Sequence, residues 1–155
     1  MVINVRLTQT NNIDKIETLA LGIGQESTID CLDRFIVGWI AQVDNEAIGG
    51  VGIFKYDDGF VIDYLSPSVD ISNQQIVCLL IKKVTDEAHS AKYFPLSIVR
   101  DQKDVAFFVQ QCGFDEVSLN DLPCLYMIRT KELCSKCDKY SKECMPTVFR
   151  YRVQK

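Results

Sequence analysis

The sequence predicts an α/β fold, a mixed sheet of about seven strands with a central parallel pair, flanked by about four helices. A chain of 155 residues, 47% hydrophobic and 25% charged, suits one core and therefore a single folded unit. Strand-like runs alternate with amphipathic helical runs in the second half. Between residues 35 and 65, three strand-like runs are joined only by short turns, which predicts an antiparallel meander.

The first elements are a strand and two helices. Residues 2–8 alternate as a strand does, and Asn12 can cap a helix that Gly22 and Gly24 end. Its apolar positions keep helical spacing: Ile13, Ile16, Leu19, Ala20 and Ile23. We expect a second, short helix over residues 26–34.

The meander comprises strands over residues 35–43, 47–55 and 60–65. Asp44-Asn45 and Asp58-Gly59 are the expected hairpin turns, because Asn, Asp and Gly tolerate positive φ.

A long amphipathic helix follows the meander. Its polar face carries Lys82, Lys83, Asp86 and Glu87, and its apolar stripe comprises Ile76, Leu79, Leu80, Val84 and Ala88. The strand over residues 93–99 is entered from this helix, so we expect it to run parallel to the strand before the helix.

The next predicted element is a helix over residues 101–112, with Asp101 near its cap and Gly113 as its stop. Its expected inward positions are Val105, Phe108, Val109 and Cys112. Two short strands, over residues 114–118 and 122–130, complete the expected sheet.

Composition excludes several classes of protein. The net charge of −4 and the pI near 5.0 leave no basic surplus for a phosphate backbone, so no nucleic-acid partner is expected. The N-terminus lacks the pattern of a signal peptide, and no apolar run approaches a membrane span. We therefore expect a cytoplasmic protein without a membrane partner. The odd number and uneven spacing of its seven cysteines argue against a disulfide framework and for reduced thiols, with the cluster near the C-terminus a separate question.

Residues 2–130 resemble the GNAT superfamily of N-acetyltransferases in the order of their elements and in three stretches. EAIGGVGIF (46–54) is similar to the family's third strand, FVIDYLSPSVD (60–70) to its fourth strand and the following loop, and QKDVAFFVQQCGF (102–114) to its late helix. We interpret residues 1–130 as a GNAT-like domain and residues 131–155 as a cysteine-containing extension packed on it.

The resemblance implies acetyl-CoA between the fourth and fifth strands, with its pyrophosphate on main-chain N–H groups at the start of the following helix. The family's phosphate loop has Gln or Arg, then two small residues, at the places of Ser72, Gln75 and Val77. Either the helix dipole and side-chain donors hold the pyrophosphate without glycine, or Ser72 or Asn73 only caps the helix and Val77 fills the cofactor's space. The candidate cofactor residues are Ser66, Ser68, Ser72, Asn73, Gln74, Gln75, Ile76, Val77 and Gln102.

Acetyl transfer also needs a base and a proton donor. The family's tyrosine donor corresponds to Val109, and Gln102 takes the place of its asparagine. Asp63 is the better candidate base, and strand alternation is expected to send its neighbour Tyr64 to the opposite face. Tyr126 is the second candidate catalytic residue, and Cys112 a weaker one.

Cys134, Cys137 and Cys144 are spaced Cys-x2-Cys-x6-Cys near the C-terminus. They suit three ligands of zinc or of an iron–sulfur cluster. A redox pair of Cys134 and Cys137, or unliganded thiols, are the alternatives.

The leading functional hypothesis is an acetyl-CoA-dependent N-acetyltransferase that acts directly on an amine of a small molecule or peptide. A catalytically degenerate GNAT-fold binding or regulatory module, responsive to metal or redox state, is the alternative. A structural metal protein is a third hypothesis, and a homodimer stays open.

Overall fold

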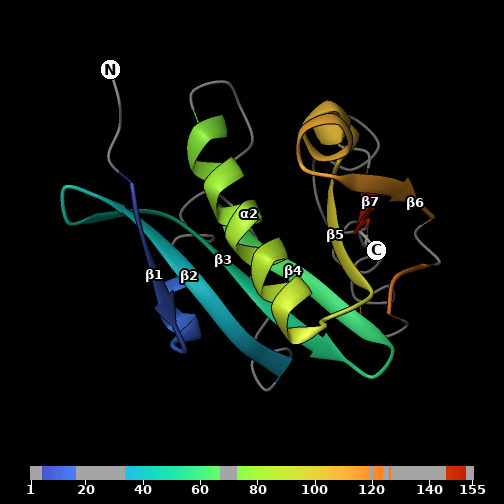
Figure 1. The fold of residues 1–155 in the computed structure, drawn as a ribbon, viewed down its shortest axis with the longest axis horizontal. Coiled ribbons are helices and arrows are strands. Elements are labelled where there is room, and N and C mark those ends of the chain that lie inside the picture. The colour runs from blue at the N-terminus through green and yellow to red at the C-terminus, as the bar shows by residue number, and fades with distance from the viewer. Residues whose placement is uncertain are drawn as a thin grey trace.

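The computed structural model describes residues 5–16, 34–66, 73–118, 121–123, 126 and 146–152. It contains the predicted seven-stranded mixed sheet, in the order β1-β2-β3-β4-β5-β7-β6 (Figure 1). The strands are β1 Arg6–Thr10, β2 Phe35–Val43, β3 Glu46–Tyr56, β4 Gly59–Ser66, β5 Leu96–Asp101, β6 Phe114–Val117 and β7 Pro146–Tyr151.

The predicted meander is confirmed, since β2, β3 and β4 pair antiparallel in succession. The first turn is also as predicted, with φ of 51° at Asp44 and 66° at Asn45. The second turn falls one residue earlier than predicted, because Gly59 already pairs with Tyr56. A Cβ on Gly59 would lie 3.3 Å from the Pro95 carbonyl oxygen, so glycine here admits the segment that leads into β5.

Helix α2, Gln74–Ala91, confirms the long amphipathic helix. Its buried face comprises Ile76, Val77, Leu80, Ile81, Val84, Thr85 and Ala88. The predicted stripe is therefore wrong at Leu79, which is only partly buried, and it omitted Val77 and Ile81. The stripe is wider than predicted because α2 packs over several strands and not along one seam.

The predicted helix over 101–112 is wrong in kind. Asp101 does cap the segment, accepting the Lys103 N–H, but a 3₁₀ turn η2, Gln102–Asp104, and a π-helical segment η3, Ala106–Gln111, replace a regular α-helix. The successive side chains Phe107 and Phe108 are both buried, and this differs from the predicted inward spacing. Gly113, at φ 77°, ends the segment as predicted.

The parallel pair of β4 and β5 is confirmed, but the last strand is not where it was predicted. Leu122, Pro123 and Tyr126 are not in a strand. The seventh strand is β7, which lies between β5 and β6 and pairs antiparallel with both. The segment expected to be an extension thus supplies a strand of the sheet, anchored by the fully buried Phe149.

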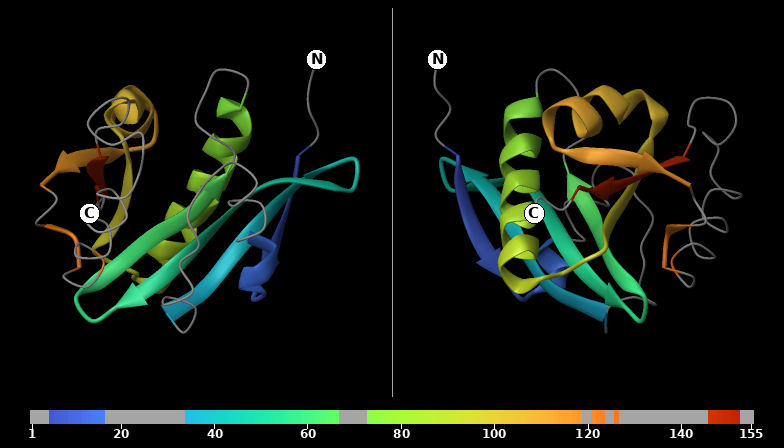
Figure 2. Two further views of the ribbon diagram at one scale, coloured as in Figure 1. Left: turned by 180° about the vertical axis from the view of Figure 1, so that it is seen from behind. Right: turned by 45° about the vertical axis from the view of Figure 1, so that its right-hand side comes forward.

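Two hydrophobic clusters cover the two faces of the sheet. α2 and η3 pack on one face, and Ile16, from the helical residues 13–16, packs on the other (Figure 2). Asn12 caps these residues as predicted, since its Oδ1 accepts the Asp14 N–H at 3.0 Å. The rest of that helix, and residues 26–33 of the next, lie outside the described residues. Within the described ranges, no helix has the length and apolar character that crossing a membrane requires.

Candidate active site

β4 and β5 separate before either strand ends. They pair only from Phe60 opposite Leu96 to Ile62 opposite Ile98, yet β4 continues to Ser66 and β5 to Asp101. We call residues 63–66 and 99–101 the β4–β5 divergence. α2 begins, and η2 follows β5, at this same end of the molecule (Figure 1). The opening expected between the fourth and fifth strands therefore has a structural counterpart here.

A β-bulge in β4 lies at this divergence. Gly52 pairs with Asp63 and Gly50 with Ser66, so β4 holds one extra residue. Tyr64 has a φ of 58°, and its N–H donates to Asp63 Oδ1 at 2.8 Å. A carboxylate one residue earlier thus stabilises a main-chain conformation that a tyrosine rarely adopts.

The bulge corrects the expected side-chain alternation. Ile62 and Leu65, three residues apart, both join the core cluster under α2. Strict alternation would place them on opposite faces, so across this bulge alternation does not separate Asp63 from Tyr64 as predicted. Tyr64 is fully buried, with its ring edge against Phe54 at a centroid distance of 5.6 Å.

The two candidate catalytic residues are not brought together by their described contacts. Asp63 is partly buried at the bulge. Tyr126 is buried with its ring 5.5 Å from that of Tyr56, which pairs with Gly59 at the hairpin end of β4. Gly59 and Asp63 are four residues apart along the strand, or about 13 Å. The catalytic roles of both remain predictions.

The start of α2 has some of the features of an anion-binding site. Its first turn has no acidic residue, and Asn73 makes no side-chain cap hydrogen bond to it. The Val77 N–H already donates to the Asn73 carbonyl at 3.0 Å, so the main-chain N–H of this predicted cofactor residue is not available to a phosphate. The first-turn groups, those of Gln74, Gln75 and Ile76, have no intrahelical acceptor.

The other predicted cofactor residues differ in position. Val77 is fully buried in the core, whereas Gln75 and Gln102 are exposed. Ser66 is 2% exposed, and its Oγ has no hydrogen-bond partner in the part of the chain that the structure describes. Ser68 and Ser72 lie outside that part.

A pair of charged residues that the sequence did not single out lies next to the divergence. Arg100 Nε is 3.6 Å from Asp104 Oδ2, with side chains 17% and 6% exposed. Burial raises the pKa of Asp104, and the positive charge of Arg100 opposes that rise. The sequence does contain a sign of this pair, since an Arg and an Asp stand four residues apart. The end of β5 lies between them, so neither strand nor helix periodicity predicts that they meet.

Cys112, one of the two cysteines in the part of the chain that the structure describes, does not have a reactive thiol. Burial raises the pKa of Cys112 to about 12, with a smaller contribution from Cys78, so Cys112 stays protonated at neutral pH. The predicted ligands Cys134, Cys137 and Cys144 lie outside the described residues. Among the residues that are described, no three His, Cys, Asp or Glu side chains gather as metal ligands would.

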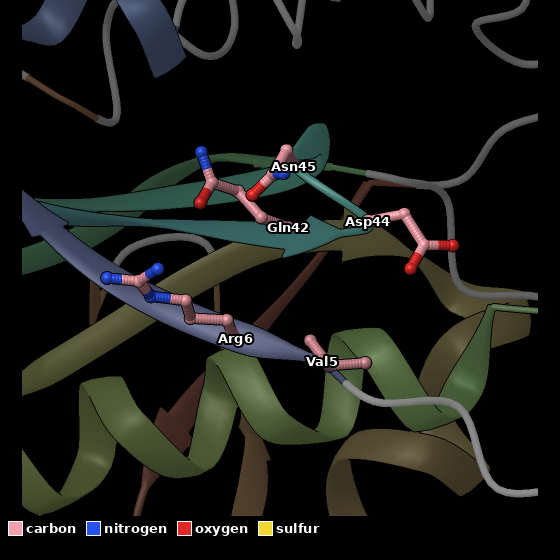
Figure 3. Close-up of a pocket in the computed structure, with 5 residues that line it drawn as sticks. All are labelled: Val5, Arg6, Gln42, Asp44 and Asn45. Atoms are coloured by element: carbon pink, nitrogen blue, oxygen red, sulfur yellow. The ribbon is translucent and has the colours of Figure 1, made fainter.

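A hollow of about 350 Å³ lies elsewhere, where β1 begins and the β2–β3 hairpin turns (Figure 3). It is lined by Val5, Arg6, Gln42, Asp44 and Asn45. β2 and β3 lie between β1 and β4 in the sheet, so this hollow is separate from the divergence.

The described sheet, whose bulged β4 separates from a parallel β5 beside the start of α2, matches solved structures of the GNAT acetyltransferase fold. Solved structures of that fold match nearly the whole chain. A GNAT family acetyltransferase from Elizabethkingia anophelis with acetyl-CoA bound matches with a TM-score of 0.62 and 18% identity, over 97% of this chain and 99% of its own. The IAA acetyltransferase from Bacillus cereus matches with a TM-score of 0.66 and 14% identity, over 97% of this chain and 100% of its own.

N-acetylglutamate synthase from Neisseria gonorrhoeae, complexed with coenzyme A and N-acetyl-glutamate, matches with a TM-score of 0.65 and 16% identity. That match covers 99% of this chain but only 36% of the synthase, so this chain spans about a third of its length. At such identities the likeness establishes the fold alone. No protein-family model matches the sequence, and no curated protein matches it.

Proposed function

We propose that this protein is an acetyl-CoA-dependent N-acetyltransferase that moves an acetyl group to an amine of a small molecule or peptide by direct transfer. The observation that carries the proposal is the β4–β5 divergence, with its bulge at Tyr64 and the start of α2 beside it. Solved structures of this fold that hold coenzyme A or acetyl-CoA support it.

In the proposed complex, the pyrophosphate lies on the first-turn N–H groups of α2, those of Gln74, Gln75 and Ile76. The partial positive charge of a helix start stabilises an anion there, and no acidic side chain in the first turn of α2 opposes it. The pantetheine arm runs between β4 and β5, whose main chains are not paired with one another beyond Ile62 and Ile98. An extended amide chain can hydrogen-bond such a strand edge.

The chemistry is attack of a neutral amine on the thioester carbonyl. The new C–N bond forms, the C–S bond breaks, the amine loses a proton to a base, and the leaving thiolate gains one. Asp63, at the bulge, is our proposed base. Tyr126 stays a predicted catalytic residue, but its ring packs at the opposite, hairpin end of β4, so we assign it no step with Asp63. Val109, at the place where the family has its tyrosine, has no proton to give.

The second candidate function is a GNAT-fold binding or regulatory module without catalysis. Two observations favour it. Val109 lacks a donor group, and Val77 is fully buried in the core where the family has a small residue.

Thermal melting and calorimetry with acetyl-CoA test cofactor binding, which the enzyme requires and the module does not. A ligand that binds only the folded state must raise the midpoint. If acetyl-CoA at millimolar concentration leaves the midpoint unchanged, the proposal is wrong.

Turnover then separates enzyme from module. Release of the CoA thiol is followed with amino acids, polyamines and peptides as acceptors. We expect Asp63→Asn to lower kcat, and Asp58→Asn, at the exposed turn, to leave it unchanged. Binding without turnover on any acceptor supports the module.

A further inference from the structure

We infer that Arg100, held in place by the buried Asp104, is a phosphate contact for the acetyl-CoA cofactor on the side of the opening that faces α2. The inference rests on the proposed function, and it identifies a residue that compensates for the missing glycines and the missing Arg or Gln of the phosphate loop.

The position of Arg100 follows from the strand to which it belongs. Leu96 and Ile98 of β5 both join the core cluster under α2. Arg100 continues that alternation on the same face, two residues beyond the last pairing of β5 with β4. α2 begins at this end of the sheet (Figure 1). Arg100 therefore lies at the divergence, on the face that also carries the helix start.

The contacts of Arg100 leave it able to bind an anion. Its Nε lies 3.6 Å from Asp104 Oδ2. Within the described residues its two terminal nitrogens make no hydrogen bond. A guanidinium presents its donors in a rigid plane, and a second anion can take the two terminal nitrogens while Nε stays with the carboxylate.

Asp104 acts as a positioning residue. Its side chain is 6% exposed, so the carboxylate is largely removed from water and needs a cation beside it. The 3₁₀ turn η2, Gln102–Asp104, brings it back over the end of β5. This fixes the guanidinium before the cofactor arrives and lowers the entropy cost of binding.

The test compares two ligands by calorimetry, acetyl-CoA and S-acetylpantetheine, which lacks the phosphates. We expect Arg100→Gln to lower the affinity for acetyl-CoA at least about tenfold, as loss of a charge-assisted hydrogen bond does. The affinity for S-acetylpantetheine should change less than about twofold. Asp104→Asn should lower the affinity for acetyl-CoA by a smaller factor, because the Arg100 guanidinium keeps its charge but loses the carboxylate that positions it.

Two further variants keep the inference testable. Arg100→Gln with Asp104→Asn removes both charges, so no buried carboxylate is left unpaired if the single variant fails to fold. Arg152→Gln is the matched control. It removes the same charge at a position away from Arg100. Arg100 pairs with Thr147 of β7, whereas Arg152 follows Tyr151, four residues further along that strand.

The outcomes are distinct. An equal loss of affinity for both ligands, or none for acetyl-CoA, overturns the inference and leaves the proposed function in place. An equal effect of Arg152→Gln also overturns it. If the wild-type protein binds neither ligand, the proposed function and the inference both fail.

Discussion

Gly38 of β2 lies where the sheet meets the helical residues 13–16, and substitution by alanine should be strongly destabilising. A Cβ at this position would collide with Ile16 Cδ1 and lie 2.7 Å from the Val51 carbonyl oxygen. The carbonyl cannot move away easily, because Val51 pairs with Trp39 in the β2–β3 ladder. Overpacking of this kind costs about 3 kcal/mol of unfolding free energy.

The measurement is urea unfolding followed by fluorescence of the single tryptophan, Trp39, which is 1% exposed. With a urea m-value of about 2 kcal/mol/M, a loss of about 3 kcal/mol lowers the midpoint by about 1.5 M. Gly52→Ala is the matched control, since Gly52 pairs with Gly38 and a Cβ added there would have a Phe54 ring carbon as its nearest neighbour, at 3.2 Å. A ring can shift where a carbonyl cannot, so we expect a cost below about 1 kcal/mol.

Ile16→Val tests the cause directly, because it deletes Cδ1, one of the two atoms in the way. In the wild-type background this change should cost about 1 kcal/mol, as a buried methylene does. In the Gly38→Ala background it should cost nothing or restore part of the stability. An equal cost of Ile16→Val in both backgrounds, or an unchanged midpoint for Gly38→Ala, would refute the reasoning.

Two further predictions concern the second half of the chain. Phe108→Ala should lower the unfolding free energy by about 4 kcal/mol in the same urea assay, because the Phe108 ring packs between those of Phe114, at 5.6 Å, and Phe149, at 5.0 Å. A cost below about 1 kcal/mol would contradict this packing. Because burial raises the pKa of Cys112 from 9.0 to about 12, the unfolded chain loses this proton first, and stability should fall as pH rises through that window. Cys112→Ala should flatten the decline, by at most about 1.4 kcal/mol per pH unit, and identical pH profiles would exclude the effect.

The features that sequence reasoning predicted correctly depend on neighbours along the chain. The turn at Asp44-Asn45 follows from the φ values that these residues tolerate, and the cap at Asp101 from a carboxylate within reach of the Lys103 N–H. The amphipathic helix follows from spacing within one element. Each involves few residues, so local chemistry is sufficient.

The errors depend on contacts between distant segments. β7 pairs with β5 and β6 although some 30 residues separate it from β6, and nothing in the sequence shows that Leu122, Pro123 and Tyr126 lie outside a strand. The bulge at Tyr64 requires a positive φ, and a tyrosine in the sequence does not predict such a conformation. Arg100 and Asp104 become a buried pair only because η2 turns back over the end of β5.

The sequence by itself determined the class of fold, the meander, the long helix and the position of the helix start that the cofactor would use. Periodicity and turn chemistry specify these, since each is a property of a short stretch. Only the tertiary structure decided which strand completes the sheet, where β4 bulges and separates from β5, and which cation lies at that point. Those features depend on which distant surfaces pack together, and burial and charge pairing are known only once they do.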